Sequence, residues 1–215
     1  MNTDNQKELV LVWDFPVRVF HWLLVVSFAG AWVTSESEAQ QMIHYAFGYS
    51  AIALVVFRLV WGVVGTRYAR FTQFIKRPSE TMSYIKSLLT GKKHIGLGHN
   101  PAGAFVMASL MTLILLIGLT GYWIVKEFLG DVMSEVHETF SSLALMLIVI
   151  HVAGAITMSF LQKENLIKSM ITGKKQGFPN QAIKYPMNLV GLLLGLVWAY
   201  VFYLVLSSAL PALIQ

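Results

Sequence analysis

The stretch HETFSSLALMLIVIH, residues 137–151, begins and ends with histidine and is mostly apolar in between. At 3.6 residues per turn, a spacing of fourteen residues puts His137 and His151 close to one face of a helix. At about 1.5 Å per residue, the two imidazoles are about 21 Å apart along the helix axis. That distance covers most of a hydrocarbon core that is about 30 Å thick. One membrane-spanning helix would therefore offer two nitrogen ligands, one near each side of a bilayer.

The composition of the chain is that of a membrane protein. Of its 215 residues, 56% are hydrophobic and 13% are charged, and the mean hydropathy is +0.62. A soluble domain carries about 25% charged residues. The sequence contains no cysteine, which excludes disulfides, cysteine-ligated iron–sulfur clusters and the Cys-x-x-Cys-His attachment of a c-type haem.

Five apolar stretches are long enough to cross a bilayer as helices. They cover residues 16–34, 42–64, 102–125, 132–160 and 187–210. The sequence therefore predicts an all-α integral membrane helix bundle. We expect a four-helix core in residues 1–175, and a linker with a fifth transmembrane helix in residues 176–215. A short polar arm (residues 1–13) precedes the first span, and PSETMSYIKSLL (residues 78–89) has the spacing of an amphipathic helix at the membrane surface.

The basic residues indicate the orientation in the membrane. Fifteen of the sixteen Lys and Arg residues lie on the face that holds the N-terminus and the links after the second and fourth spans, and only Lys126 lies on the other face. The positive-inside rule makes the basic face cytoplasmic, so the C-terminus is expected in the periplasm of a bacterial inner membrane. Because membrane topology accounts for the net charge of +5, we expect no nucleic acid as a partner. The periplasmic face carries the acids Glu36, Glu38, Glu127, Asp131, Glu135 and Glu138.

With this topology, four histidines pair by depth. His44 and His137 open their spans at the outer face, whereas His21 and His151 lie toward the inner face. Each pair could clamp one haem iron between two imidazoles and leave no open coordination position, which favours one-electron transfer. We therefore expect two non-covalent b haems. A zinc cluster would need ligands much closer together than the spacing along this helix allows.

Three basic residues are candidates for contacts with haem propionates or a quinone. Arg58 shares the helix face of His44 near the inner haem, and Arg18 precedes His21 by three residues. A charged side chain within a span usually has a partner, and propionates are suitable anions. The alternative for both arginines is a side chain that extends to the cytoplasmic boundary. His99, just before the third span, could contact a propionate or quinone, or it could be a solvated loop histidine.

Several of these motifs resemble those of a known family. They are VWDFPVRVFHWLL (12–24), HYAFGYSAIALVVFRLVWGVVG (44–65), YARFTQF (68–74), GHNPAGA (98–104) and the stretch from His137 to His151. Over about residues 11–175 the chain resembles the bacterial cytochrome b561 family, which is related to the b-type cytochrome subunits of nickel–iron hydrogenases. The resemblance implies four helices, two b haems, and His21, His44, His137 and His151 as the axial ligands. The fifth span departs from this pattern, so it could serve a homo-oligomer or the docking of an extra subunit.

The sequence thus predicts a protein that transfers electrons across the membrane between the quinone pool and a periplasmic partner such as a c-type cytochrome. It could be a simple electron-transfer protein or a subunit of a quinone-linked oxidoreductase. A quinone site is expected near the inner haem, with Arg58, Trp61, Arg67, Tyr68 and His99 as candidate residues. The acidic outer face favours a basic protein partner, and it disfavours the alternative of a superoxide:quinone oxidoreductase because it repels an anion. A hydrogenase-type cytochrome subunit and a haem-binding protein without redox turnover are the remaining alternatives.

Overall fold

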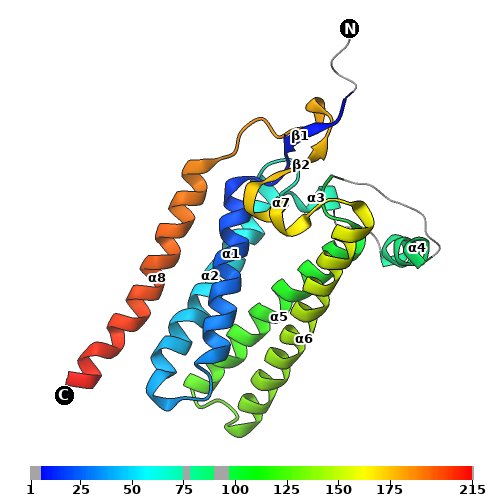
Figure 1. The fold of residues 1–215 in the computed structure, drawn as a ribbon. Helices are drawn as coiled ribbons and strands as arrows, with labels where there is room; N and C mark the ends of the chain where they lie inside the picture. Colours follow the sequence, from blue (N-terminus) through cyan, green and yellow to red (C-terminus); the bar gives the residue numbers. More distant parts are fainter. Residues whose placement is uncertain (1–5, 75–77, 90–96, 215) are drawn as a thin grey trace.

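Five long helices make up most of the structure, a computed structural model that describes residues 6–74, 78–89 and 97–214 (Figure 1). All five are long and apolar enough to cross a membrane, as the sequence predicted. They are α1 (Phe15–Val33), α2 (Gln41–Val64), α5 (Pro101–Val125), α6 (Asp131–Gln162) and α8 (Asn188–Ile214). The all-α membrane bundle is therefore confirmed, with helix bounds within a few residues of those expected.

Short elements connect the long helices. They are the strands β1 (Glu8–Leu11) and β2 (Lys174–Gly177), the helices α3 (Phe71–Phe74), α4 (Pro78–Leu89) and α7 (Leu166–Thr172), and two 3-10 turns (Glu38–Gln40 and Pro179–Gln181). The predicted helix over residues 78–89 is confirmed as α4, but most of its apolar side chains lie outside the described part of the chain. The prediction of a simple polar arm over residues 1–13 is wrong for residues 8–11. These residues pair antiparallel with β2, with Glu8 opposite Gly177 and Leu11 opposite Lys174.

Capping residues explain where two of the spans begin. The Oδ1 atom of Asp14 accepts a hydrogen bond from the Val17 amide at 2.8 Å, and Pro16 occupies the first turn of α1. Asn100 caps α5 in the same way, accepting from the Gly103 amide at 2.7 Å, and Pro101 follows it. A side-chain acceptor followed by proline is a strong start signal because it satisfies an amide that has no partner within the helix.

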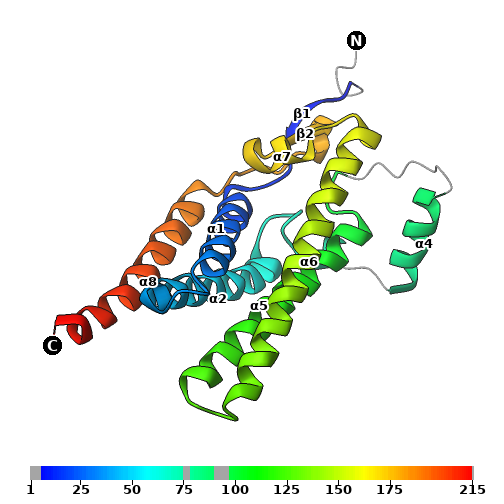
Figure 2. The same cartoon turned by 60° about the horizontal axis from the view of Figure 1, so that its bottom comes forward.

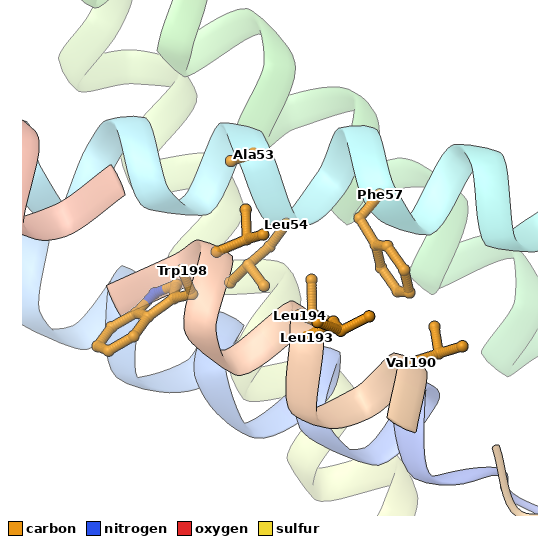
Figure 3. A pocket seen from close by; sticks show the side chains of 8 residues that line it. Ala53, Leu54, Phe57, Val190, Leu193, Leu194 and Trp198 are labelled. Atoms are coloured by element: carbon orange, nitrogen blue, oxygen red, sulfur yellow. The ribbon is translucent and has the colours of Figure 1, made fainter. Parts of the chain in front are cut away.

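The long helices form two groups, which Figure 2 shows side by side. Helices α1, α2 and α8 pack on one another, α5 packs along α6, and α2 also contacts α5. Helix α8 is anchored within the membrane region, where the Trp198 indole nitrogen donates to Ser27 Oγ on α1 at 2.9 Å. An apolar cavity of about 180 Å³ lies between α2 and α8, lined by residues such as Phe57, Leu194 and Trp198 (Figure 3). The fifth helix is therefore an integral part of the bundle.

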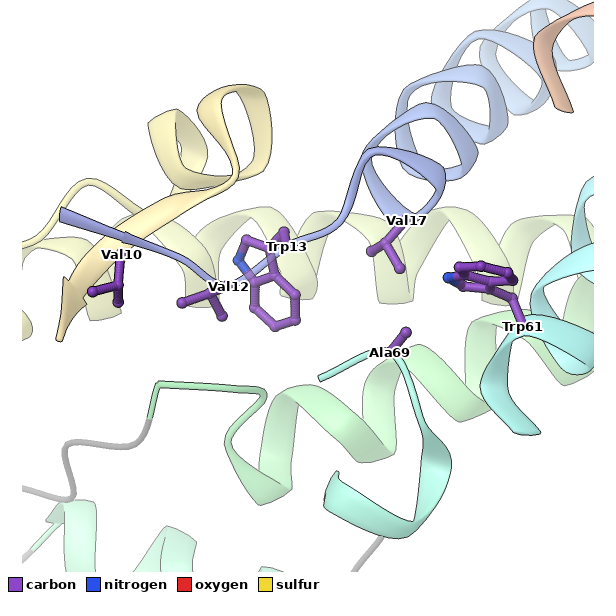
Figure 4. Close-up of a cluster of buried hydrophobic side chains, with 6 residues drawn as sticks. All are labelled: Val10, Val12, Trp13, Val17, Trp61 and Ala69. Carbon is purple, nitrogen blue, oxygen red and sulfur yellow. The ribbon is translucent and has the colours of Figure 1, made fainter. Parts of the chain in front are cut away.

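A small hydrophobic cluster closes the end of the bundle where β1, β2 and α7 gather (Figure 1). Its members are Val10, Val12, Trp13, Val17, Trp61 and Ala69 (Figure 4). The amides of Val12 and Trp13 donate to the carbonyl of Gly173, at 2.8 and 3.0 Å, which ties the segment before α1 to the segment after α7. Gly173 adopts a φ of +80°, a conformation that suits glycine.

Asp14 adds a polar link at the same end. It is 1% exposed, and its Oδ2 accepts from the Trp61 indole at 3.0 Å and from the Thr66 hydroxyl at 2.6 Å. Because its Oδ1 caps α1, this one carboxylate joins the start of α1 to the end of α2.

Candidate metal-binding histidine pairs

The four candidate ligand histidines lie in two pairs, each between α6 and another helix. The ring centres of His44 on α2 and His137 on α6 are 6.2 Å apart, and those of His21 on α1 and His151 on α6 are 6.4 Å apart. The pairs are the ones that the depth argument predicted. We call His44 and His137 the outer pair, and His21 and His151 the inner pair.

The spacing within each pair fits a single metal ion between the rings. Two imidazoles that share one metal through nitrogen bonds of about 2 Å would have ring centres about 6.3 Å apart. The observed 6.2 and 6.4 Å agree with this value. Among the described residues, no group of three or more His, Cys, Asp or Glu side chains could hold a metal ion, so zinc-type clusters have no support there.

Two glycines leave space beside the histidines. A Cβ atom added at Gly48, one turn after His44, would meet no atom of the described chain within 4 Å, and the same holds at Gly154, close to one turn after His151. A planar macrocycle needs such room between helices. The imidazole donors and this space fit a b haem at each pair, and the role of the four histidines as axial ligands stays a prediction.

The outer pair is held by backbone carbonyls. The Nδ1 atom of His44 lies 2.8 Å from the Ala31 carbonyl oxygen, and the Nδ1 atom of His137 lies 3.0 Å from that of Ile117 and 3.1 Å from the Thr120 hydroxyl. A carbonyl oxygen can only accept, so Nδ1 carries the proton in both rings. This tautomer leaves Nε2 as the metal-binding nitrogen, which is the usual arrangement for a ligand histidine.

The inner pair has a different environment. Within residues 6–74, 78–89 and 97–214, neither His21 nor His151 makes a hydrogen bond through its ring. His21 instead packs edge-on against Trp22, with ring centres 5.2 Å apart. The Trp22 indole donates to the Met170 carbonyl at 3.3 Å, so α7 closes this side. The rings of the inner pair are positioned by packing.

The two candidate arginines lie at the end of the bundle where the inner pair lies. Arg58 is 1% exposed, and its Nη2 donates to the Ala69 carbonyl at 3.0 Å. Its guanidinium lies over the ring of Phe71, with 5.1 Å between the Cζ atom and the ring centre. The Nη1 atom of Arg18 donates to the Ile171 carbonyl at 2.7 Å. Propionate binding by either arginine stays a prediction.

His99 lies next to the inner pair and is not a solvated loop residue. Its ring packs on that of Trp13, with 4.5 Å between ring centres. Burial, together with the positive charges of nearby groups such as Arg58 and Lys175, lowers the pKa of His99 to about 3. Its ring is therefore neutral at physiological pH. Whether it contacts a propionate or a quinone stays a prediction.

Lys175 was not among the residues predicted from the sequence. This side chain on β2 is 5% exposed and pairs with Glu164, with 3.5 Å between Nζ and Oε2. Burial lowers the pKa of Lys175, although Glu164 opposes that shift. Nothing in the sequence distinguishes it from Lys174, because the strand that turns one lysine inward forms only on pairing with β1. Lys175 adds a second buried cation near His99.

The end of the bundle that holds the outer pair is acidic and exposed. The exposed acids are Glu36, Glu38, Glu127, Asp131, Glu135 and Glu138. A shallow hollow along α6 is lined by Glu135, Glu138, Ser142 and Met146, among others. Two of the exposed acids therefore line a hollow on the helix that carries His137.

Comparisons with known proteins agree with this arrangement. The family described as prokaryotic cytochrome b561 matches residues 12–173 of the chain, a range that contains all four paired histidines. A probable Ni/Fe-hydrogenase B-type cytochrome subunit of Rhizobium leguminosarum bv. viciae is 24% identical over 218 residues, covering 79% of this chain and 90% of the relative. No solved structure matches the chain.

Proposed function

The chain belongs to the prokaryotic cytochrome b561 family and is a membrane b-type cytochrome, and from this premise we propose that it transfers electrons across the bacterial inner membrane between the quinone pool and a periplasmic redox partner. One observation carries the proposal. Two imidazole pairs, each spaced for one iron, lie at different depths along α6.

The four histidines are proposed to bind two b haems, the inner pair one and the outer pair the other. With an imidazole on each side, neither iron has a free position for oxygen or another small ligand. Each haem, when bound, supplies a site that accepts and releases one electron. Helix α6 contributes one histidine to each pair and so fixes their separation along the membrane normal.

The inner end is proposed to bind the haem propionates and the quinone. Arg58 and Arg18 would offset the negative charge of the propionates. A quinone headgroup would lie among Arg58 and Trp61 of α2, Arg67 and Tyr68 of the link after α2, and His99 of the GHNPAG turn. The position of Arg58 supports the first role, because it places a buried guanidinium at the end of the bundle that holds the inner pair, where a propionate could bond to it.

The outer end is proposed to receive a soluble partner of opposite charge, such as a c-type cytochrome. Its exposed acids would attract a basic surface and raise the encounter rate at low salt. This assignment assumes the orientation that the basic residues indicate, with the N-terminus in the cytoplasm and the C-terminus in the periplasm.

A second candidate function is that of a cytochrome subunit in a hydrogenase-like complex. The observation that favours it is the match to the Rhizobium protein, whose name is that of a hydrogenase subunit and 90% of which is covered. In this reading the core of residues 1–175 binds the haems, and the fifth helix could contact another subunit or a second copy. A superoxide:quinone oxidoreductase ranks lower because the acidic outer surface repels superoxide, and a haem-binding protein without redox turnover would not react with quinol.

Purification of the full chain in detergent tests the proposal. We expect two b haems per chain by the pyridine haemochrome assay, reduction by a quinol, and reoxidation by a basic c-type cytochrome. A preparation without haem would refute the whole proposal. Two haems that no quinol reduces would refute the electron-transfer part and favour haem binding alone.

A further inference from the structure

The two histidine pairs differ in what their Nδ1 atoms contact, and this difference bears on their redox properties. In the outer pair, both rings donate from Nδ1 to helix carbonyls that belong to α1 and α5. In the inner pair, no such bond is present within the described part of the chain, and aromatic packing positions the rings instead.

An Nδ1–H bond to an acceptor makes the imidazole a stronger electron donor at Nε2. A more basic ligand stabilises the ferric form of a haem iron over the ferrous form, and so lowers its midpoint potential. The outer pair has such a bond on both of its ligands. Its iron is therefore expected to be the harder of the two to reduce.

Thr120 adds to this effect at His137. Its side chain is 3% exposed, and its hydroxyl oxygen lies 3.1 Å from His137 Nδ1. The same hydroxyl lies 2.9 Å from the Leu116 carbonyl oxygen, to which it can donate a hydrogen bond. The oxygen lone pairs then face the His137 N–H, which is shared between Thr120 and the Ile117 carbonyl at 3.0 Å.

Helix α5 brings these acceptors close to the ring because it carries a glycine at the contact. A Cβ atom at Gly121 would lie 3.3 Å from His137 Cε1, tighter than an ordinary contact. Gly121 and Thr120 together therefore position His137, Gly121 by giving room and Thr120 by accepting a hydrogen bond from Nδ1.

We propose that Thr120 is a positioning residue that, with the Ile117 and Ala31 carbonyls, sets the outer site at a lower midpoint potential than the inner site. The inference rests on the proposed function and adds a direction to it, from the periplasm to the quinone pool. With haems bound, His44 and His137 would hold the site that accepts one electron at a time from a reduced periplasmic partner, and His21 and His151 would hold the site that passes it on to the quinone. Two such transfers and two protons from water on the cytoplasmic side reduce one quinone to a quinol.

Potentiometric titration of the purified full chain, followed by haem absorbance, tests the proposal. We expect two one-electron waves in the unmodified protein. Thr120→Val should move the lower wave upward and leave the higher wave in place. An expected tenfold change in the ratio of reduced to oxidised iron at fixed potential corresponds to about 59 mV for a one-electron couple.

Three further variants separate the hydroxyl from the packing. Thr120→Ser keeps the hydroxyl, so its lower wave should stay at the potential of the unmodified protein. Thr120→Ala lacks the hydroxyl and should move the lower wave upward. It replaces Thr120→Val in the test if the valine variant loses haem. Thr112→Val is the matched control, because the Thr112 hydroxyl is on the same helix and donates to the Ala108 carbonyl of that helix at 3.0 Å. It should move neither wave.

The outcomes distinguish this inference from the proposed function. Absence of haem or of a second wave would refute the two-haem function itself. Three results would overturn the role of Thr120 and leave the proposed function standing. In the first, Thr120→Val and Thr120→Ala leave both waves unchanged. In the others, the higher wave shifts, or Thr112→Val gives an equal shift.

Discussion

The two ends of the bundle differ in how they surround their histidine pair. At the inner end, β1, β2 and α7 close over the bundle (Figure 1), and Arg58 and Lys175 are buried there near the half-buried His99. At the outer end, short exposed links join α1 to α2 and α5 to α6, and acidic side chains outnumber the basic Lys126. An enclosed basic end suits a small molecule from the membrane, whereas an open acidic end suits a protein surface. A pair of histidines is thus placed at an enclosed basic end and another at an open acidic end, and variants at each end should have different effects.

The largest effect is expected from removing a ligand. His151→Ala or His21→Ala should abolish the inner haem and keep the outer one, since each pair needs both imidazoles. The pyridine haemochrome assay should then give about half the haem of the unmodified chain. Ser207→Ala is the control, because the Ser207 hydroxyl bonds within its own helix and belongs to neither pair. Retention of both haems in either alanine variant would show that the pairing is wrong.

The histidine pairs could be predicted because depth and helix periodicity are local properties. The spacing from His137 to His151 and the alternation of spans predicted the same two pairs of rings that lie close together in the structure. The cap at Asp14 was predicted for the same reason, since acceptor and proline are neighbours in sequence.

The inner end could not be predicted in this way. Strands β1 and β2 have four residues each and are separated by more than 160 positions, so neither has a recognisable pattern alone. The bonds from Trp61 and Thr66 to Asp14 and the burial of Lys175 depend on that distant pairing. The Thr120 contact to His137 was missed because it depends on the register between α5 and α6.

The second prediction concerns the stability of the inner end. Asp14→Ala should lower the free energy of unfolding by about 3 kcal/mol, because the Val17 amide, the Trp61 indole and the Thr66 hydroxyl all lose their acceptor. Thermal loss of haem absorbance in detergent measures it. Asp131→Ala, an exposed acid at the start of α6, is the control and should cost well under half as much. Equal losses would mean that the Asp14 network adds nothing beyond an ordinary cap.

The third prediction concerns the outer end. Reversing Glu36, Glu38 and Asp131 to lysine should slow electron exchange with a basic c-type cytochrome about tenfold at low salt, because steering is lost. Stopped-flow spectroscopy measures the rate, and the difference should shrink in high salt as the charges are screened. Glu80→Lys makes the same kind of charge change on α4 and should leave the rate unaffected. A rate that stays the same in the triple variant would remove the argument for a basic partner.

The smallest effect is expected from a contact that belongs to neither end. Ser27→Ala removes the acceptor of the Trp198 indole between α1 and α8, and such bonds within a membrane are worth about 0.6 kcal/mol on average and up to about 1.7. Ser207→Ala on α8 is the control, because that hydroxyl bonds to the Leu204 carbonyl of its own helix. The thermal stability of Ser27→Ala should fall slightly below that of Ser207→Ala, and both variants should keep two haems with unchanged midpoint potentials. If the loss of this bond instead released haem, the fifth helix would be part of the haem-binding core, and the two ends could no longer be treated as independent settings on a four-helix frame.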